Sequence, residues 1–381
     1  MAAIVFAMLP EEGHLLTSFK LARELISHGH EVCYIASERQ NEYIHAQGFK
    51  SYCLTGMPLT SVREKGVNKV NELIYGHRNE IVACLKDLRP ELLIVDAFTP
   101  MMALIAYRVD VPMIFMNTSL DTDMTRMVLE DLAESFGQSK TVVETILKIP
   151  EMVTCPREYD FQHTIQDNRT RFYIEASIDL DRKEPAFRWE KIEQNKPLIY
   201  CALGSQSHHY VESKKVFQAI IDALALKQEY QMILSVGMRY DIDEFYSVPP
   251  NVLIVNWSPQ LEILKRASIM ITHGGIGTVK ECIFLGVPMI VFPMMRNQPM
   301  TGARVVYHGL GVRGDINSIS AESVLSLIEK IEKEPAIKAR VEKMGRKFQE
   351  IEKSQKGLII IQKFLNALFA TRSRLMSESS F

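Results

Sequence analysis

The sequence lacks two features that would assign it to specialised classes: a membrane-spanning apolar run and an excess of basic residues. The apolar segment GLIIIQKFLNALFA at 357–370 is short and carries Gln362, Lys363 and Asn366. Lys and Arg number 44 against 46 Asp and Glu, and the formal net charge is -2. We therefore expect neither an integral membrane protein nor a nucleic-acid-binding protein.

Cysteine is scarce and scattered. The six cysteines contain no CxxC pair, which argues against a disulfide framework and against a clustered metal site. The N-terminus MAAIVFAMLPEEGH has no basic segment before its short apolar run and turns acidic after it. It is predicted to form a first strand rather than a signal peptide. Both features predict a cytoplasmic protein with reduced thiols.

What the sequence does contain is a repeated alternation of strand and helix patterns. AAIVFAML at 2–9, ELLIVD at 91–96 and VPMIFMN at 111–117 are typical of buried strands, and the alternation restarts with LIYCALGS at 198–205. Parallel strands require crossover helices, and 381 residues are enough for two cores. The predicted fold class is α/β: two Rossmann-like, doubly wound parallel-sheet domains facing a central cleft.

Interruptions of this alternation indicate the domain boundaries. Residues 121 to about 180 are predicted to be helical or irregular, and the charged, proline-bounded segment 181–197 is interpreted as a linker. The predicted division is an N-terminal domain at 1–180, the linker at 181–197, a C-terminal domain at 198–355, a helix at 356–371 that could pack back on the N-terminal domain, and a tail at 372–381.

The stretch 268–298 combines a strand, a tight turn and a helix start. The apolar run 269–271 is followed by THGG at 272–275, and a helical pattern begins at once. The first N–H groups of a helix have no intrahelical partner and lie at the positive end of its dipole, so this turn suits a phosphate. His273 could donate to the same anion, and Glu281 could accept from ribose hydroxyls. An ordinary glycine-rich turn is the alternative interpretation.

Separated motifs then carry a family resemblance. They are WSPQ at 257–260, HGGIGTVKE at 273–281, GVP at 286–288, NQ at 297–298, GH at 13–14 and the aspartate of LLIVDAF at 92–98. The first four, in this order and at this spacing, resemble the C-terminal donor-binding signature of family 1, UDP-glycosyltransferase-like enzymes of the bacterial natural-product type. GH and the aspartate resemble the catalytic positions of that family.

The resemblance implies a GT-B architecture over all of the chain except its tail, with an acceptor-binding N-terminal domain and a donor-binding C-terminal domain. It implies an inverting, metal-independent hexosyltransferase that moves a sugar from a UDP- or TDP-sugar to a hydroxyl of a small lipophilic acceptor, such as a natural product in antibiotic biosynthesis. The nucleotide sugar is a co-substrate, so no cofactor is expected. A monomer or a homodimer is expected.

Two residues are predicted to carry the catalysis. An acceptor hydroxyl is a poor nucleophile, so a base must take its proton, and His14, placed on the loop after the first strand, is the candidate. Asp96 ends the strand ELLIVD and could accept from the other ring nitrogen. The alternatives are a surface histidine and a helix-capping aspartate.

The remaining site residues are predicted to bind the donor. Trp257 offers a flat face to the nucleotide base, and the Gln260 amide is expected near the ribose. The predicted donor-binding set is Gly204, Ser205, Trp257, Ser258, Gln260, His273, Gly274, Gly275, Gly277, Thr278, Glu281, Asn297 and Gln298. His273 and the helix start at 275–278 could replace a metal ion beside the leaving diphosphate.

Asn297 departs from the family pattern, which generally has an acid before the glutamine. An amide keeps one acceptor, adds donors and loses the charge, so a deoxy sugar, an amino sugar and an ordinary hexose all stay open. Two other functions also stay open: a GT-B nucleotide-sugar epimerase or hydrolase, and a non-catalytic nucleotide-sugar binding helper protein.

Overall fold

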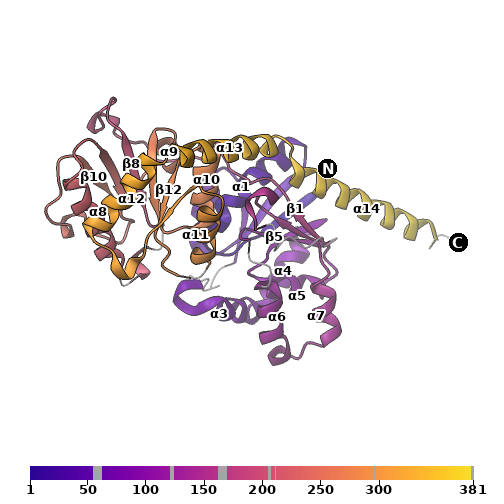
Figure 1. The fold of residues 1–381 in the computed structure, drawn as a ribbon. Coiled ribbons are helices and arrows are strands. Elements are labelled where there is room, and N and C mark those ends of the chain that lie inside the picture. The colour runs from indigo at the N-terminus through magenta and orange to yellow at the C-terminus, as the bar shows by residue number, and fades with distance from the viewer. Residues whose placement is uncertain are drawn as a thin grey trace. The chain divides into compact units, whose positions relative to one another are not determined.

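The computed structural model describes residues 1–54, 62–120, 124–161, 170–204, 207–210, 212–295 and 297–378. It divides the chain into two compact units (Figure 1). The first unit is Met1–Arg182 together with Ile351–Phe381, and the second is Lys183–Glu350. Each unit holds one parallel sheet with helices packed on it, so the predicted class of two Rossmann-like α/β domains is confirmed.

The sheet of the first unit has seven strands in the order β3-β2-β1-β4-β5-β6-β7, and all pairs are parallel. The strands are β1 (Ala3–Ala7), β2 (Glu31–Ala36), β3 (Lys50–Cys53), β4 (Leu92–Asp96), β5 (Met113–Asn117), β6 (Glu151–Val153) and β7 (Arg171–Tyr173). Side chains alternate along β1, so that Ile4 and Phe6 enter one core cluster while Val5 and Ala7 enter another. A sheet that is apolar on both faces needs helices packed on both faces.

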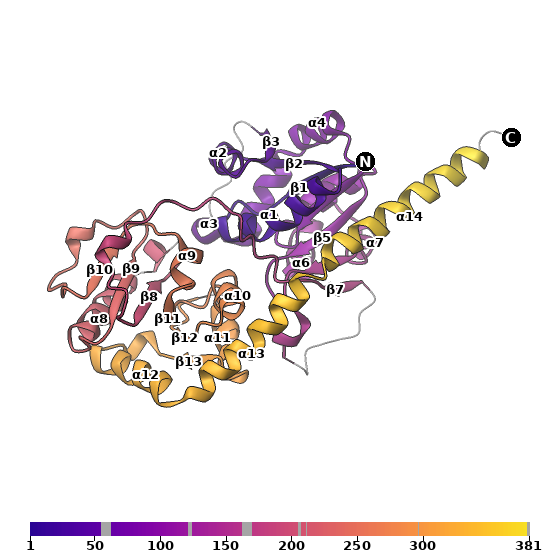
Figure 2. The ribbon, with the colours of Figure 1, turned by 90° about the horizontal axis from the view of Figure 1, so that it is seen from above.

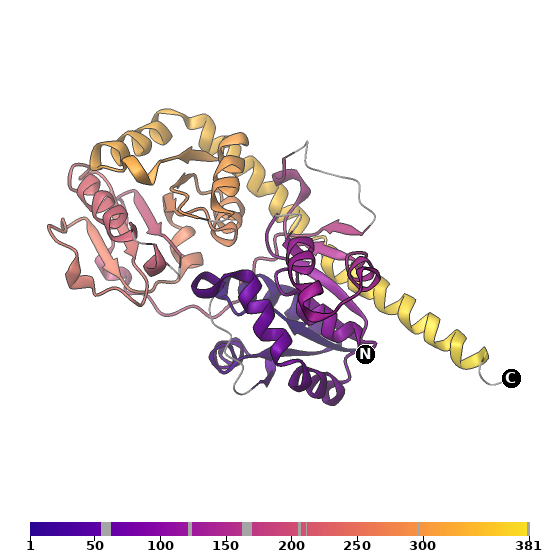
Figure 3. The same cartoon turned by 90° about the horizontal axis from the view of Figure 1, so that it is seen from below.

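The helices of the first unit cover these two faces. They are α1 (Glu12–Ser27), α2 (Glu38–Ala46), α3 (Val62–Gly76), α4 (Arg78–Leu88), α5 (Pro100–Tyr107), α6 (Met124–Ala133), α7 (Lys140–Ile146) and α14 (Lys356–Glu378). Helices α1, α2 and α14 share a core cluster with Ile4, whereas α3 to α7 share one with Val5. Figures 2 and 3 show that the C-terminal part of α14 extends past the sheet.

The second unit repeats the plan with six parallel strands in the order β10-β9-β8-β11-β12-β13. The strands are β8 (Leu198–Ala202), β9 (Gln231–Ser235), β10 (Val252–Val255), β11 (Ala267–Thr272), β12 (Met289–Val291) and β13 (Gly311–Arg313). The helices are α8 (Ser213–Ala225), α9 (Gln260–Leu264), α10 (Ile276–Leu285), α11 (Gln298–Tyr307), α12 (Ala321–Lys333) and α13 (Pro335–Glu352). Helix α10 follows the HGG turn. Its packing face is formed by Val279, Cys282 and Ile283, which are fully buried.

Two sequence-based expectations are wrong in detail. The region 121–180, predicted to be helical or irregular, also contains β6 and β7, because three-residue strands are too short to show a period-two pattern. The helix predicted to end at residue 371 continues to Glu378, since TRSRLMSE contains neither glycine nor proline to stop it. No helix in the described part of the chain is long and apolar enough to cross a membrane.

Candidate functional site

His14 and Asp96 lie together in the first unit because their strands are neighbours. β4 pairs directly with β1, and Asp96 is the last residue of β4. His14 lies in the first turn of α1, the helix that follows β1, and not in the preceding loop. Its Nδ1 is 2.7 Å from Oδ2 of Asp96, although the two residues are 82 positions apart in sequence.

The environment of Asp96 fixes the orientation of the histidine. Asp96 is fully buried, its Oδ2 also accepts from the N–H of Leu9 at 3.2 Å, and its Oδ1 accepts from the N–H of Phe98 at 2.9 Å. Three N–H groups therefore converge on the two oxygens of one carboxylate. With Nδ1–H of His14 donating to Asp96, Nε2 is left as the proton acceptor. The His14 side chain is 18% exposed, so it is open to a substrate.

The sequence interpretation missed two neighbours of His14. Oγ1 of Thr118 lies 2.8 Å from Nδ1 of His14, and the Phe98 ring packs edge-on against the imidazole at 5.1 Å between ring centroids. Thr118 directly follows β5, the strand paired with β4, and Phe98 lies two residues after Asp96. Their positions after buried strands are the signal that could have identified them.

Glu12, in the same turn as His14, gives the first unit a testable pH dependence. Burial raises the pKa of Glu12 to about 7, against the opposing effects of Arg182, Arg39 and a hydrogen bond with Tyr43. Because the pKa of Glu12 in the folded protein lies above its value in the unfolded chain, the protonated carboxyl contributes its full stability below the unfolded-state pKa. This stability is lost as the pH rises toward 7. The loss is on the order of 2 kcal/mol.

Glu12→Gln is therefore expected to reduce the fall in Tm between pH 5 and pH 8, because the side chain no longer ionises. The matched control is Glu38→Gln, an exposed residue in the first turn of α2. Thermal unfolding at both pH values measures the effect. A Glu12→Gln variant that loses as much Tm as the wild type would contradict the assignment.

In the second unit, His273 sits where β11 ends and α10 begins. Its side chain is 6% exposed and is enclosed by glycines. A methyl group on Gly204 would lie 2.7 Å from Cε1 of His273, and one on Gly275 would lie 2.7 Å from Nε2. Gly204 and Gly274 also have φ values of +86° and +83°, which side chains disfavour. These glycines therefore fix the imidazole at the N-terminus of α10.

The sequence-based assignment of His273 to the nucleotide sugar predicts that Gly275→Ala displaces His273 and weakens nucleotide binding at least about tenfold, the loss expected from one charge-assisted hydrogen bond. Calorimetric titration of UDP and TDP measures this loss. Gly76→Ala is the control, because a methyl group there meets no atom within 4 Å. Equal nucleotide affinity in Gly275→Ala and Gly76→Ala would show that the position of the His273 ring does not matter for binding.

Gln260, Thr278 and Glu281 are brought together across α9 and α10. Nε2 of Gln260 donates to Oε2 of Glu281 at 2.6 Å and is 3.4 Å from Oγ1 of Thr278. Glu184 was not singled out from the sequence, and its carboxylate accepts from the N–H groups of Leu261 and Glu262 at the start of α9. Glu184 therefore holds the start of α9, and the side chains of Gln260, Thr278 and Glu281 lie together beside it.

Trp257 and Ser258 lie just before this turn. Trp257 is 41% exposed and is free of the core, so its ring is available to a ligand. The Ser258 hydroxyl is buried and is 3.0 Å from the hydroxyl of Tyr200, which fits a structural contact within the unit. Ser205 lies outside the described residues. Gly277 is the second residue of α10, and a methyl group added there would meet open space.

Gln298 is engaged within the protein at both ends of its amide. Its Oε1 accepts from the N–H groups of Met294 and Met295 at 2.8 and 2.9 Å, and its Nε2 donates to the Tyr210 hydroxyl at 2.7 Å. Gln298 is 2% exposed. Asn297 precedes it at the N-cap of α11 and makes no side-chain capping bond. Gln298 is thus the residue of the pair that is held inside the protein, whereas the Asn297 side chain does not cap the helix.

Comparisons with known proteins find similar glycosyltransferases. Residues 182–351 match the family model described as UDP-glucoronosyl and UDP-glucosyl transferase. The NDP-glycosyltransferase YjiC of Bacillus subtilis (strain 168) is 25% identical over 383 residues, which cover 94% of this chain and 96% of that protein.

Two solved structures have the same fold. The glycotransferase of kitacinnamycin has a TM-score of 0.78 at 22% identity and covers 95% of this chain and 98% of its own. The glycosyltransferase VinC in complex with DTDP has a TM-score of 0.74 at 16% identity, with 95% and 99% covered. The chain is therefore similar over nearly its whole length to family 1, GT-B glycosyltransferases of the bacterial natural-product type, and the predicted resemblance is confirmed.

Proposed function

We propose that the protein is an inverting glycosyltransferase that moves a sugar from a UDP- or TDP-sugar to a hydroxyl of a small lipophilic acceptor. The observation that carries this proposal is the His14–Asp96 pair, 2.7 Å apart, in a chain whose residues 182–351 match a nucleotide-sugar transferase family. An imidazole that is 18% exposed and held by a buried carboxylate is the arrangement that general-base catalysis requires.

The reaction is a single displacement. Nε2 of His14 takes the acceptor's hydroxyl proton while the oxygen attacks the anomeric carbon, and the bond from that carbon to the diphosphate oxygen breaks. The imidazolium formed on His14 is stabilised by the negative charge of Asp96. Attack on the face opposite the leaving group inverts the anomeric configuration.

The donor is held by the second unit. The leaving diphosphate gains negative charge, which His273 and the backbone N–H groups at the start of α10 stabilise without a metal ion. Glu281 and Gln260 take the ribose hydroxyls, and Trp257 stacks on the base. VinC was solved with DTDP, which supports a TDP donor, while the matched family's description names UDP-sugars.

The sugar is selected beside Asn297. In this assignment Gln298 holds the turn at 294–295 in place through its three hydrogen bonds, and Asn297 presents its amide to the sugar hydroxyls. Because an amide both donates and accepts, it tolerates a wider set of sugar substituents than a carboxylate.

A donor panel tests the proposed function. The full chain is incubated with UDP- and TDP-sugars, with and without a mixture of phenolic and macrocyclic alcohols, and released nucleotide diphosphate is measured in buffer with and without EDTA. We expect release that depends on the acceptor and is unchanged by EDTA. Equal release without acceptor would favour a hydrolase or epimerase, and tight donor binding with no release would favour a helper protein.

A further inference from the structure

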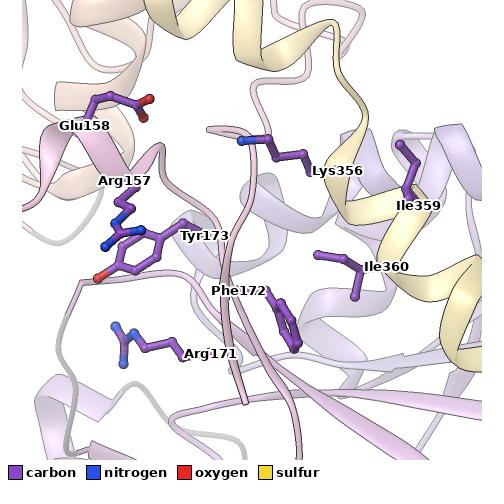
Figure 4. A pocket seen from close by; sticks show the side chains of 8 residues that line it. All are labelled: Arg157, Glu158, Arg171, Phe172, Tyr173, Lys356, Ile359 and Ile360. Atoms are coloured by element: carbon purple, nitrogen blue, oxygen red, sulfur yellow. The ribbon is translucent and has the colours of Figure 1, made fainter. Parts of the chain in front are cut away.

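The first unit contains a pocket at its sheet edge that shares no residue with the groups around His14 and His273. The pocket has a volume of about 420 Å³ and is lined by three segments: the 3-10 helix η2 (Arg157–Tyr159), the edge strand β7 and the first turn of α14. Figure 4 shows its lining, with the arginine side chains and Tyr173 toward one end and isoleucines of α14 toward the other. The lining carries three cationic side chains and one carboxylate, Glu158.

Contacts within the described part of the protein account for only part of the Arg171 side chain in this pocket. Its side chain is only 10% exposed, and its Nη1 pairs with Oε2 of Glu151 at 2.9 Å. Nε and Nη2, which form another edge of the guanidinium, are buried and have no hydrogen-bond partner among the residues that the structure describes. A buried donor without a hydrogen-bond partner is destabilising, and Arg171 carries two such donors on one charged group.

The chemistry of this open edge identifies the group it fits. Nε–H and Nη2–H are parallel donors spaced to bind two oxygens of a carboxylate or phosphate. Arg157 and Lys356 also line the pocket and add positive charge. Glu151 does not compete for the edge, because its other oxygen accepts from Nδ2 of Asn117 at 2.7 Å.

The opposite wall of the pocket is apolar and uncovered. Phe172 is 37% exposed and Ile359 is 43% exposed, and Ile360 lines the pocket beside them. Exposed large apolar side chains next to a cationic end are suited to a ligand with a charged head and a hydrocarbon body.

We propose that this pocket binds a small amphipathic anion, a carboxylate or a phosphate monoester on a short hydrocarbon chain. The anionic group pairs with the open edge of Arg171, and the hydrocarbon lies against Phe172 and α14. Nε and Nη2 are closed to water in this structure, so binding requires the neighbouring Tyr173 side chain to move aside. The Tyr173 ring centroid is 5.7 Å from Cζ of Arg171, and its hydroxyl, which donates to Oδ2 of Asp160 at 2.7 Å, gives up that hydrogen bond when the ring moves.

Calorimetric titration of the full chain tests the proposal, with octanoate and octyl phosphate as probes and inorganic phosphate and octanol as references. We expect saturable binding of at least one probe, at least tenfold tighter than either reference, and the tighter probe identifies the head group. No saturable binding of either probe would overturn the proposal. A reference that binds as tightly as the probes would overturn the amphipathic class.

Variants place the binding in this pocket. Arg171→Lys keeps a cation beside Glu151 but lacks the second donor edge, and we expect at least tenfold weaker binding. Should this variant not fold, Ile359→Asp at an exposed position puts a carboxylate into the pocket and is expected to abolish binding. Lys363→Ala, at an exposed position of α14 outside the lining, should bind like the wild type. Unchanged binding in the folded Arg171→Lys or Ile359→Asp variant would overturn the proposal.

Discussion

His14→Ala is expected to lower kcat for sugar transfer by about 10²–10⁴-fold, the range that one general base contributes. Alanine leaves no group at the position of Nε2 to take the acceptor's proton. His14 is 18% exposed and its loss leaves a carboxylate that still accepts from Leu9 and Phe98, so the fold should be kept. Steady-state rates of nucleotide diphosphate release measure the effect.

The same variant should bind the donor normally, because every proposed donor contact lies in the second unit. Calorimetric titration with the donor or its nucleotide diphosphate checks this point. His28→Ala, at an exposed position at the end of α1, is the matched control and should retain wild-type rates. A His14→Ala enzyme that turns over at more than a tenth of the wild-type rate would reject His14 as the base.

Asp96→Asn is expected to lower kcat by about 10²–10⁴-fold and to destabilise the fold by about 1–3 kcal/mol. The carboxylate accepts from three donors through two oxygens. An amide has one oxygen, so its NH₂ group must face at least one of these N–H donors. If it faces Leu9 and His14, the imidazole turns to the tautomer whose Nε2 carries a proton and cannot act as a base.

Transfer rates and chemical denaturation together measure the two effects of Asp96→Asn. Asp110→Asn is the control, because Asp110 is exposed and its φ of +55° is tolerated equally by asparagine. An Asp96→Asn variant within threefold of the wild-type kcat would show that the buried charge does not support His14.

The sequence predicted the fold class well because the alternation of buried apolar strands with amphipathic helices repeats along most of both units. Buried apolar runs such as Leu92–Asp96 have no polar face, which requires helices on both sides of the sheet. β6 and β7 were missed because each contributes only three residues, and their places in the sheet are set by the pairing of β6 with β5 and of β7 with β6 and not by their own composition.

The site was predictable only where neighbouring strands determine the contact. His14 and Asp96 follow two paired strands, so their proximity follows from the strand order. The engagement of Gln298 depends on Tyr210, which comes from a loop 88 positions earlier, and no local pattern indicates that contact. The glycines of the HGG turn were interpreted as room for a phosphate, and the structure adds that they also make room for the His273 ring.

The anomeric configuration of the product tests the central claim, a one-step transfer with His14 as base, most directly. With an α-linked nucleotide sugar as donor, the proton–proton coupling at the anomeric carbon of the purified product distinguishes the two outcomes by NMR. Single displacement predicts a β-linked product. An α-linked product would require a second displacement and would contradict the account.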